Sequence, residues 1–233
     1  MPSRLALDIE TISPRLEPNE YPDFEDPDDF ELFAVALQYQ DAGRPPERPR
    51  VLFRDSLSPR AERDLIERVA DRVLYHRPDE IVTYNGDDFD HWLLRERPFR
   101  AGETPDAERV SDAIERALGS AESVDLIDDA WERCGEYTTL EAACRSAGLE
   151  PAVTSYEEYD HGLPESVRRH LDGDALEGAH VPVIGEAYLA ALDGHRDDID
   201  TDAVRRMIRA YAVGDIEHLF SLADRYGRGA LSG

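Results

Sequence analysis

Short apolar runs separated by polar segments dominate the first ninety residues. Residues 4–9 suit a core strand, and residues 80–84 form a β-branched run typical of a buried parallel strand. Strand character is also present at residues 32–39 and 50–54. Ser58-Pro59 then gives an N-cap signal, and an apolar stripe at helical spacing follows as far as His76. This pattern predicts the order β-β-β-α-β.

After residue 90 the apolar positions recur mainly at helical spacing. The expected helices cover roughly residues 88–96, 106–118, 126–135, 139–147, 164–171, 181–192 and 201–225. Residues 13–30 are rich in proline and acid and indicate a surface loop. We therefore expect one α/β domain over residues 1–226, with a largely helical second half whose last long helix returns to the sheet, and a flexible tail at 227–233.

Length and composition restrict the class of protein. The chain has 233 residues, with 41% hydrophobic and 33% charged side chains, which is typical of a soluble globular protein with one sizeable core. Its apolar runs are far shorter than the roughly 20 residues of a membrane span, and an acid at position 8 interrupts any signal-peptide core. We expect a cytoplasmic protein with no membrane contact. Cys134 and Cys144 lack a CxxC partner, so reduced, buried cysteines are expected.

The charge balance is unusual. There are 52 acidic residues against 26 basic ones, all of them arginine, and the net charge is −26. Nucleic-acid-binding proteins usually carry a basic surface, so this charge would ordinarily argue against a polyanionic partner. The acid-rich, lysine-free composition resembles that of proteins from extreme halophiles, and at about 1 M salt the Debye length is only about 3 Å. Net charge then says little about partners, and acidic motifs arise easily by chance.

Asp8 and Glu10 form the first acidic pair of interest. Residues i and i+2 of a strand point to the same face, so both carboxylates would project from one side of the first strand where it ends. Two adjacent acids repel each other unless a cation lies between them. Asp-x-Glu recurs in four other places in this chain, so the bare pattern is uninformative. Its position directly after the apolar residues 5–7 separates this pair from the others, because strand ends are ligand positions in open α/β sheets.

The second segment runs from Asn85 to Asp90. It follows the buried strand, turns at Gly86 and enters a helix. Phe89 can pack beneath the turn while Asp90, in the first helical turn, faces the strand ends and gains from the helix dipole. Asp87 and Asp88, which precede them, are expected only to cap the helix.

The third segment is Tyr211-x-x-x-Asp215. Residues i and i+4 share one face of a helix, and this pair lies within a long helical pattern. The shared apolar stripe consists of Val204, Ile208, Tyr211, Asp215 and Leu222. An aspartate within a core-facing stripe is costly unless it is paired or bound to a metal, which makes Asp215 a strong candidate for a metal ligand.

The three segments, in this order, resemble the exonuclease motifs of the DnaQ-like (DEDD) 3′–5′ exonucleases, which have the ribonuclease H-like fold. The set is most similar to the proofreading domains of family-B DNA polymerases and their stand-alone relatives. Tyr211 places it in the DEDDy branch, since a DEDDh enzyme would have histidine where this chain has Ala210. Residues 139–144 and 148–149 also look like the connecting helices of that family. The resemblance implies a mixed central sheet flanked by helices.

The same resemblance implies a mechanism and a set of site residues. Two divalent cations, Mg²⁺ or Mn²⁺, would be held by four acids, Asp8, Glu10, Asp90 and Asp215. Tyr211 would orient the attacking water. The contacts to nucleic acid would come from Thr11, Asn85 and Phe89. The implied substrate is a single-stranded DNA or unpaired 3′ end, and a DNA polymerase or repair complex is the implied protein partner.

Other interpretations stay open at this point. The same acids would serve RNA trimming, because nothing in these motifs distinguishes the 2′-hydroxyl group. A catalytically idle nucleic-acid-binding or polymerase-binding module, or an enzyme of the same fold that cuts internally, are further alternatives. Arg95, Arg97 and Arg100 equally fit a nucleic-acid contact or a solvated charged face. We expect Trp92 and Trp131 to be core residues and not base-stacking platforms, and His91 and His218 to be partly exposed or packed in the core. Asp125, Asp128 and Asp129 are expected to begin a helix.

Overall fold

A computed structural model describes residues 1–16, 21–100, 105–171 and 173–226. In these residues five strands form one sheet in the order β3-β2-β1-β4-β5. The strands are β1 (Arg4–Ile12), β2 (Glu31–Gln40), β3 (Arg50–Phe53), β4 (Glu80–Thr83) and β5 (Glu122–Asp125). The β1–β2 and β2–β3 pairs are antiparallel, whereas the β1–β4 and β4–β5 pairs are parallel. The sheet is therefore mixed.

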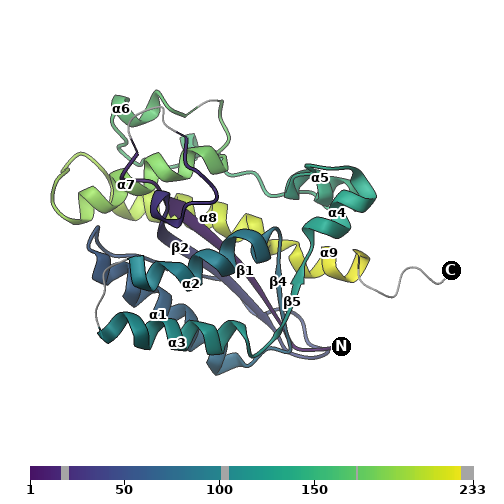
Figure 1. Cartoon of the computed structure of the whole chain (residues 1–233). Helices are drawn as coiled ribbons and strands as arrows, with labels where there is room; N and C mark the ends of the chain where they lie inside the picture. The colour runs from purple at the N-terminus through teal and green to yellow at the C-terminus, as the bar shows by residue number, and fades with distance from the viewer. Residues whose placement is uncertain (17–20, 101–104, 172, 227–233) are drawn as a thin grey trace.

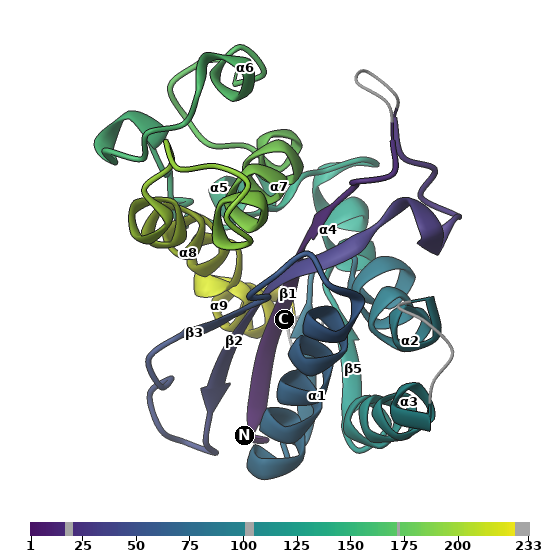
Figure 2. The same ribbon diagram turned by 90° about the vertical axis from the view of Figure 1, so that its left-hand side faces the viewer.

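Helices cover both faces of this sheet (Figure 1). The α-helices are α1 (Pro59–His76), α2 (His91–Arg100), α3 (Pro105–Leu118), α4 (Ile127–Cys134), α5 (Leu140–Ser146), α6 (Glu165–Arg168), α7 (Val181–Leu192), α8 (Thr201–Glu217) and α9 (Leu219–Tyr226). Single turns occur at η1 (Pro27–Asp29), η2 (Gly86–Asp90), η3 (Tyr156–Glu158) and η4 (Gly178–His180), and η2 is a π-helix. Figure 2 shows α1, α2 and α3 on one side of the sheet and α7, α8 and α9 on the other.

Alternation along β1 divides the apolar residues between two cores. Leu5, Leu7 and Ile9 pack with α1 and α3, whereas Ala6 and Ile12 pack with α7 and α8. Helix α7 lies close to the sheet at Gly185, where a Cβ atom would come within 2.6 Å of the Ile12 side chain. This alternation decides which helices the acids of β1 will face.

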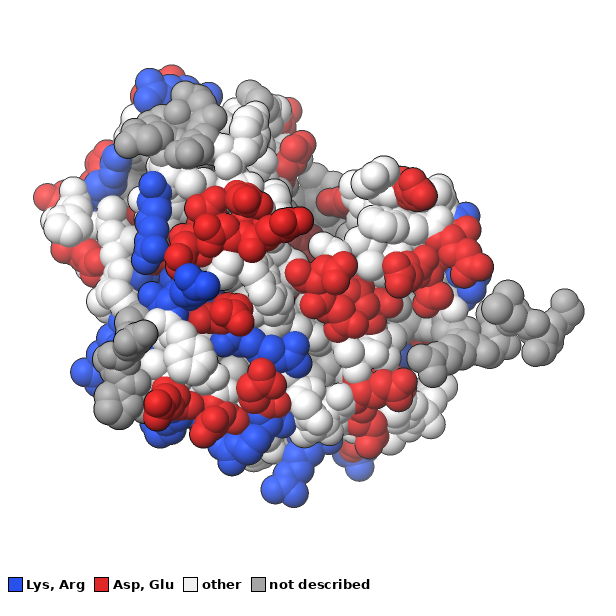
Figure 3. Space-filling model, in the orientation of Figure 1, with Lys and Arg blue, Asp and Glu red and all other residues white. Residues whose placement is uncertain are grey.

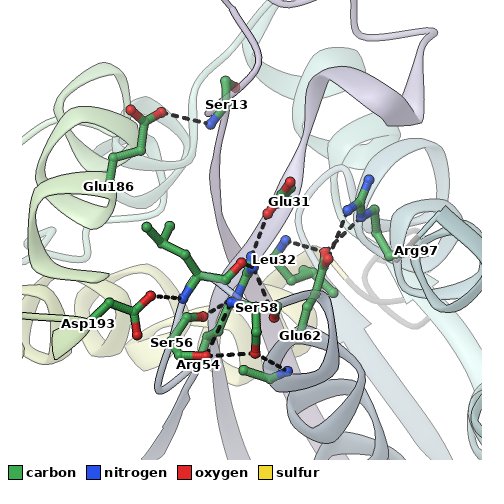
Figure 4. Close-up of polar contacts among 12 residues, drawn as sticks. Ser13, Glu31, Leu32, Arg54, Ser56, Ser58, Glu62, Arg97, Glu186 and Asp193 are labelled. Carbon is green, nitrogen blue, oxygen red and sulfur yellow. Dashed lines mark hydrogen bonds and ion pairs between the residues drawn. The ribbon is translucent and has the colours of Figure 1, made fainter. Parts of the chain in front are cut away.

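Buried ion pairs hold the start of β2 against the helices (Figure 4). Arg97 donates to both oxygens of Glu62 at 2.7 and 2.8 Å, and both side chains are only 1% exposed. Glu62 also accepts from the backbone N–H of Leu32, and Arg97 donates to the carbonyl oxygen of Pro27. The second half of the expected surface loop is thus anchored to α1 and α2. Residues 17–20 of that loop and the expected tail at 227–233 lie outside the described residues.

Most of the expected elements are confirmed, with four departures. The order β-β-β-α-β and the helix at 181–192 are as predicted. Strand β5 was not predicted, because Glu122-Ser-Val-Asp is short, polar and largely exposed. The single helix expected over 201–225 was wrong: it is divided into α8 and α9 at His218. The helix expected over 164–171 is only the four-residue α6, and β1 continues to Ile12 instead of ending near Asp8.

Two expectations about environment can also be compared with the structure. Among the described helices, none combines the length and the apolar character needed to cross a bilayer. Cys144 is buried as expected, but Cys134 is exposed, so the prediction for Cys134 was wrong. Both cysteines are free thiols.

Candidate metal centre

Asp8 and Glu10 lie within β1, on the face that α8 covers. They share this face with Ala6, which belongs to the core beneath α7 and α8. Strand β4 pairs with β1 only over Arg4–Ala6, so β1 extends beyond its parallel neighbour. The acids therefore lie where β4 stops, not at the end of β1.

Asp215 of α8 joins this pair. Oxygen atoms of Asp8, Glu10 and Asp215 lie within 4.8 Å of one another. Tyr211, one helical turn before Asp215, hydrogen-bonds to the Asp215 carboxylate. Glu10 is only 6% exposed, and its buried Oε1 atom has no hydrogen-bond partner among the residues that the structure describes.

Asp90 approaches from a different direction. It ends the π-helix η2, is 5% exposed, and its Oδ1 atom accepts a 3.0 Å hydrogen bond from the backbone N–H of Ile9. Single π-turns are frequent at functional sites. Asp90 is not part of the three-carboxylate cluster, but it is bound to the backbone between Asp8 and Glu10.

Burial and neighbouring carboxylates raise the pKa values of all four acids. Burial is the largest cause for all four of them. For Asp8 the neighbouring charges that raise the pKa further belong to Glu10, Asp90 and Asp215. The pKa of Asp90 is raised to about 8 and that of Asp215 to about 7. Burial, followed by the Asp215 charge, also raises the pKa of the Tyr211 phenol well above its usual value, so the phenol stays protonated.

These residues fit a divalent cation. Among the described residues, the charged groups that perturb the pKa values of Asp8 and Glu10 are all carboxylates, so no described arginine offsets their mutual repulsion. A cation would neutralise that repulsion and give the buried Glu10 Oε1 atom a partner. An oxygen-only set of ligands is typical of Mg²⁺ or Mn²⁺.

Comparison with solved structures identifies the fold. The family B DNA polymerase from the hyperthermophilic archaeon Pyrobaculum calidifontis matches 97% of this chain with a TM-score of 0.55 and 22% sequence identity. The fold is ribonuclease H-like. This chain covers 24% of that polymerase chain, so the match concerns about a quarter of the larger protein. No family model and no curated protein matches the sequence.

The three residues expected to contact nucleic acid are close in sequence to two of the acids: Thr11 follows Glu10, and Asn85 and Phe89 precede Asp90. Asn85 is exposed and adopts a left-handed conformation with φ of 65°, whereas Thr11 is partly buried just after a bulge in β1. Phe89 is partly buried, and its ring packs against Phe30 and Phe24, with centroids 5.1 and 5.8 Å away. Asn85 and Phe89 therefore flank the turn that leads to Asp90.

The three arginines after the second motif all have carboxylate partners. Arg97 is buried against Glu62, Arg95 pairs with Glu115 on α3, and Arg100 pairs with Asp28. The structure therefore favours an internal role for Arg97 over a solvated face. In the view of Figure 3, acidic side chains form a broad band across the middle of the molecule, and arginines gather toward its left and lower edges.

The two histidines and Trp92 have the packing environments that were expected, whereas Trp131 was expected in the core but packs beside the exposed Tyr137, outside both core clusters. His91 is 4% exposed and its Nδ1 atom lies 3.1 Å from Asp87. His218 Nε2 lies 2.7 Å from the carbonyl oxygen of Glu150. Trp92 and Trp131 are both partly buried.

Three residues near the site were missed by the sequence reasoning. Asp125 was assigned only to a helix start, yet it also binds the turn before Asp90. After burial, Glu141 on α5 is the main cause of the raised Asp215 pKa. A Cβ atom on Gly178 would lie 3.5 Å from the Tyr211 hydroxyl. Only Asp125 had a sequence signal, since an acid directly after Val124 fits the end of a strand.

Proposed function

We propose that the protein is a metal-dependent 3′–5′ exonuclease of the DEDDy type that acts on single-stranded DNA or unpaired 3′ ends. The observation that carries the proposal is the convergence of Asp8, Glu10 and Asp215, from a strand and a helix far apart in the chain. They meet at the buried Glu10 Oε1 atom, which has no hydrogen-bond partner in the described part of the chain. The order of the three motifs and the ribonuclease H-like fold support it. The fold alone would not, because one fold hosts many activities.

Each residue has a defined part in the proposed reaction. Asp8, Glu10 and Asp215 would hold one divalent cation, and Asp8 together with Asp90 would hold a second. When bound, such a pair of cations supplies positive charge at both the attacking and the leaving oxygen of an in-line displacement. Tyr211, kept protonated by its raised pKa, would orient the attacking water through its position beside Asp215, not remove a proton from it.

The substrate end would lie beside the turn at residues 85–90. The exposed Asn85 amide can donate to a phosphate or a base edge. The partly buried Phe89 ring directly precedes Asp90 in sequence, and the Thr11 hydroxyl directly follows Glu10. Nothing in these motifs distinguishes the 2′-hydroxyl group, so both DNA and RNA have to be tested. DNA comes first because the motifs resemble those of DNA polymerase proofreading domains. We also propose that the acidic, lysine-free surface is an adaptation to high salt.

The test uses a 5′-labelled single-stranded DNA oligonucleotide with Mn²⁺ in high KCl, sampled over time. A descending ladder of one-nucleotide steps is expected from the wild-type protein and none from Asp8→Asn or Asp215→Asn. Asp106→Asn is the matched control, because it belongs to another Asp-x-Glu pair whose aspartate is exposed on α3. The control should cleave at the wild-type rate.

Two results would contradict the proposal. Internal fragments in place of a ladder would indicate an endonuclease. An intact oligonucleotide, with folded protein and bound Mn²⁺, would move the substrate to RNA, and failure on both substrates would indicate an idle binding module.

A further inference from the structure

Asp125, at the end of β5, holds the turn that precedes Asp90. Its Oδ1 atom accepts from the backbone N–H of Asn85 at 2.7 Å, and its Oδ2 atom accepts from that of Asp87 at 3.0 Å. Oδ1 also accepts from the N–H of Ile127 at 3.1 Å, which joins the turn to the start of α4. One carboxylate thus binds both sides of Gly86.

This turn has a demanding backbone geometry. Asn85 has a φ of 65°, and its side chain does not cap the helix that follows. Gly86 lies so close to Thr83 that a Cβ atom would meet the Thr83 side chain at 2.4 Å. Backbone N–H groups at such a turn need acceptors from outside it. The carboxylate of Asp125 supplies them from the neighbouring strand.

Strand β5 makes a second contact with the same turn. Ser123 lies two residues before Asp125, on the same face of β5, and its hydroxyl donates to Asp87 Oδ1 at 2.5 Å. The same Asp87 oxygen lies 3.1 Å from His91 Nδ1 at the start of α2. The turn is therefore held at its backbone by Asp125 and at its side chain by Ser123.

The held turn leads directly to the metal centre. It continues into the π-helix that ends at Asp90, and Asp90 is bonded to the backbone N–H of Ile9, between Asp8 and Glu10. We infer that Asp125 is a positioning residue for Asp90: it fixes the place of that carboxylate relative to the acids of β1, without touching metal or substrate itself. This inference rests on the proposed function, since it concerns the second cation that Asp90 would hold.

The inference requires a carboxylate at position 125. Three N–H groups point at two oxygens, and all of these contacts need an acceptor. In Asp125→Asn one carboxylate oxygen is replaced by an NH₂ group. An NH₂ group cannot accept a hydrogen bond from a backbone N–H, so at least one of these contacts is lost. Asp125 holds the turn that carries Asp90, in the role that a direct outer partner has for other metal ligands, and loss of such a partner typically weakens metal binding or activity by about 10–100-fold. In Asp125→Asn we therefore expect weaker Mn²⁺ binding at one of the two sites and slower cleavage.

The experiment measures Mn²⁺ binding by calorimetry or electron paramagnetic resonance, together with cleavage and thermal unfolding. It compares the wild-type protein with Asp125→Asn and with Asp128→Asn, an exposed acid three residues later that provides the matched charge change. The expected result is two Mn²⁺ ions in the wild type and the control. In Asp125→Asn one of them should bind about 10–100-fold more weakly. A double-mutant cycle with Asp90→Asn adds a test of mechanism, because Asp125→Asn should have little further effect on Mn²⁺ binding once Asp90 is replaced.

The outcomes separate the inference from the proposed function. Unchanged Mn²⁺ binding in Asp125→Asn, or a purely additive cycle, overturns the positioning role and leaves the exonuclease proposal intact. A wild-type protein that neither binds Mn²⁺ nor cleaves nucleic acid overturns both. If Asp125→Asn does not fold, Ser123→Ala removes only the outer contact to Asp87. That variant should still weaken one Mn²⁺ site a few-fold, and unchanged binding overturns the inference.

Discussion

Replacing Asp215 with asparagine should stabilise the metal-free protein at neutral and alkaline pH. Burial and the Glu141 charge raise the pKa of Asp215 from 3.8 to about 7. The folded state therefore binds a proton on Asp215 more tightly than the unfolded chain does, so the stability of the metal-free protein falls as the pH rises from about 4 to about 7. The asparagine has no charge to desolvate, and its oxygen can still accept from the Tyr211 hydroxyl.

The size of this effect follows from the same shift. Each pH unit between the two pKa values is about 1.36 kcal/mol, so the stabilisation at pH 8 is at most about 4 kcal/mol, and at pH 5 less than half of that. Asp215 is partly exposed, and solvent screening places the real gain below this bound. Mn²⁺ at about 1,000 times its Kd should then reverse the order, because a ligand at that concentration adds about 4.1 kcal/mol to the protein that binds it.

Urea unfolding at constant high salt measures both effects, first with a chelator at pH 5 and pH 8 and then with Mn²⁺. Asp224→Asn is the control: its carboxylate pairs with the largely buried Arg4, so this variant should lose stability. The reasoning would be refuted if Asp215→Asn were less stable than the wild type in chelator at pH 8. It would equally be refuted by the same difference at both pH values.

Three further predictions follow from other contacts. Arg97→Met leaves the Glu62 carboxylate buried without its partner, so urea unfolding should show a loss of about 3–5 kcal/mol; a loss below about 1 kcal/mol would contradict a buried charge pair. Tyr211→Phe keeps the ring but removes the hydroxyl that hydrogen-bonds to Asp215, so cleavage should fall about 10–100-fold even at saturating Mn²⁺, and calorimetry should find weaker Mn²⁺ binding as well. The net charge of −26 repels DNA, and salt screens this repulsion. The rate of DNA cleavage should therefore rise with KCl over the range in which circular dichroism shows the protein folded. A rate that falls with salt, as in most nucleic-acid-binding proteins, would instead indicate basic residues near the site that bind the phosphates of the substrate.

Sequence reasoning was most successful where a single element carries both the periodicity and the chemistry. Asp8 with Glu10, and Tyr211 with Asp215, each share one face of one element, and the alternation of β1 directs its pair toward α8. Their approach to within 4.8 Å depends on how α8 packs on the sheet, which no local pattern contains.

The parts that were missed depend on contacts between elements. Strand β5 has four residues, and pairing with β4 defines it, not its own apolar pattern. The sequence pattern therefore predicted that Asp125 only begins a helix. Its Oδ1 atom does accept from the N–H of Ile127 at the start of α4, but it also accepts from the N–H of Asn85. The break between α8 and α9 at His218 contains no proline or glycine, so the apolar spacing predicted one continuous helix across it.

The hydrogen bond from Ile9 to Asp90 has a consequence for the evolution of this chain. Because β4 stops pairing at Ala6, the Ile9 N–H has Asp90 as its acceptor in place of a strand neighbour. A descendant that lost catalysis would be free to drift at Asp8, Glu10 and Asp215, where removing a charge relieves repulsion. At position 90 we expect only aspartate or asparagine to persist, because a side chain without an oxygen would leave a buried N–H unpaired. Divergent descendants would thus keep this one residue of the motif for the sake of the sheet, long after the reaction had gone.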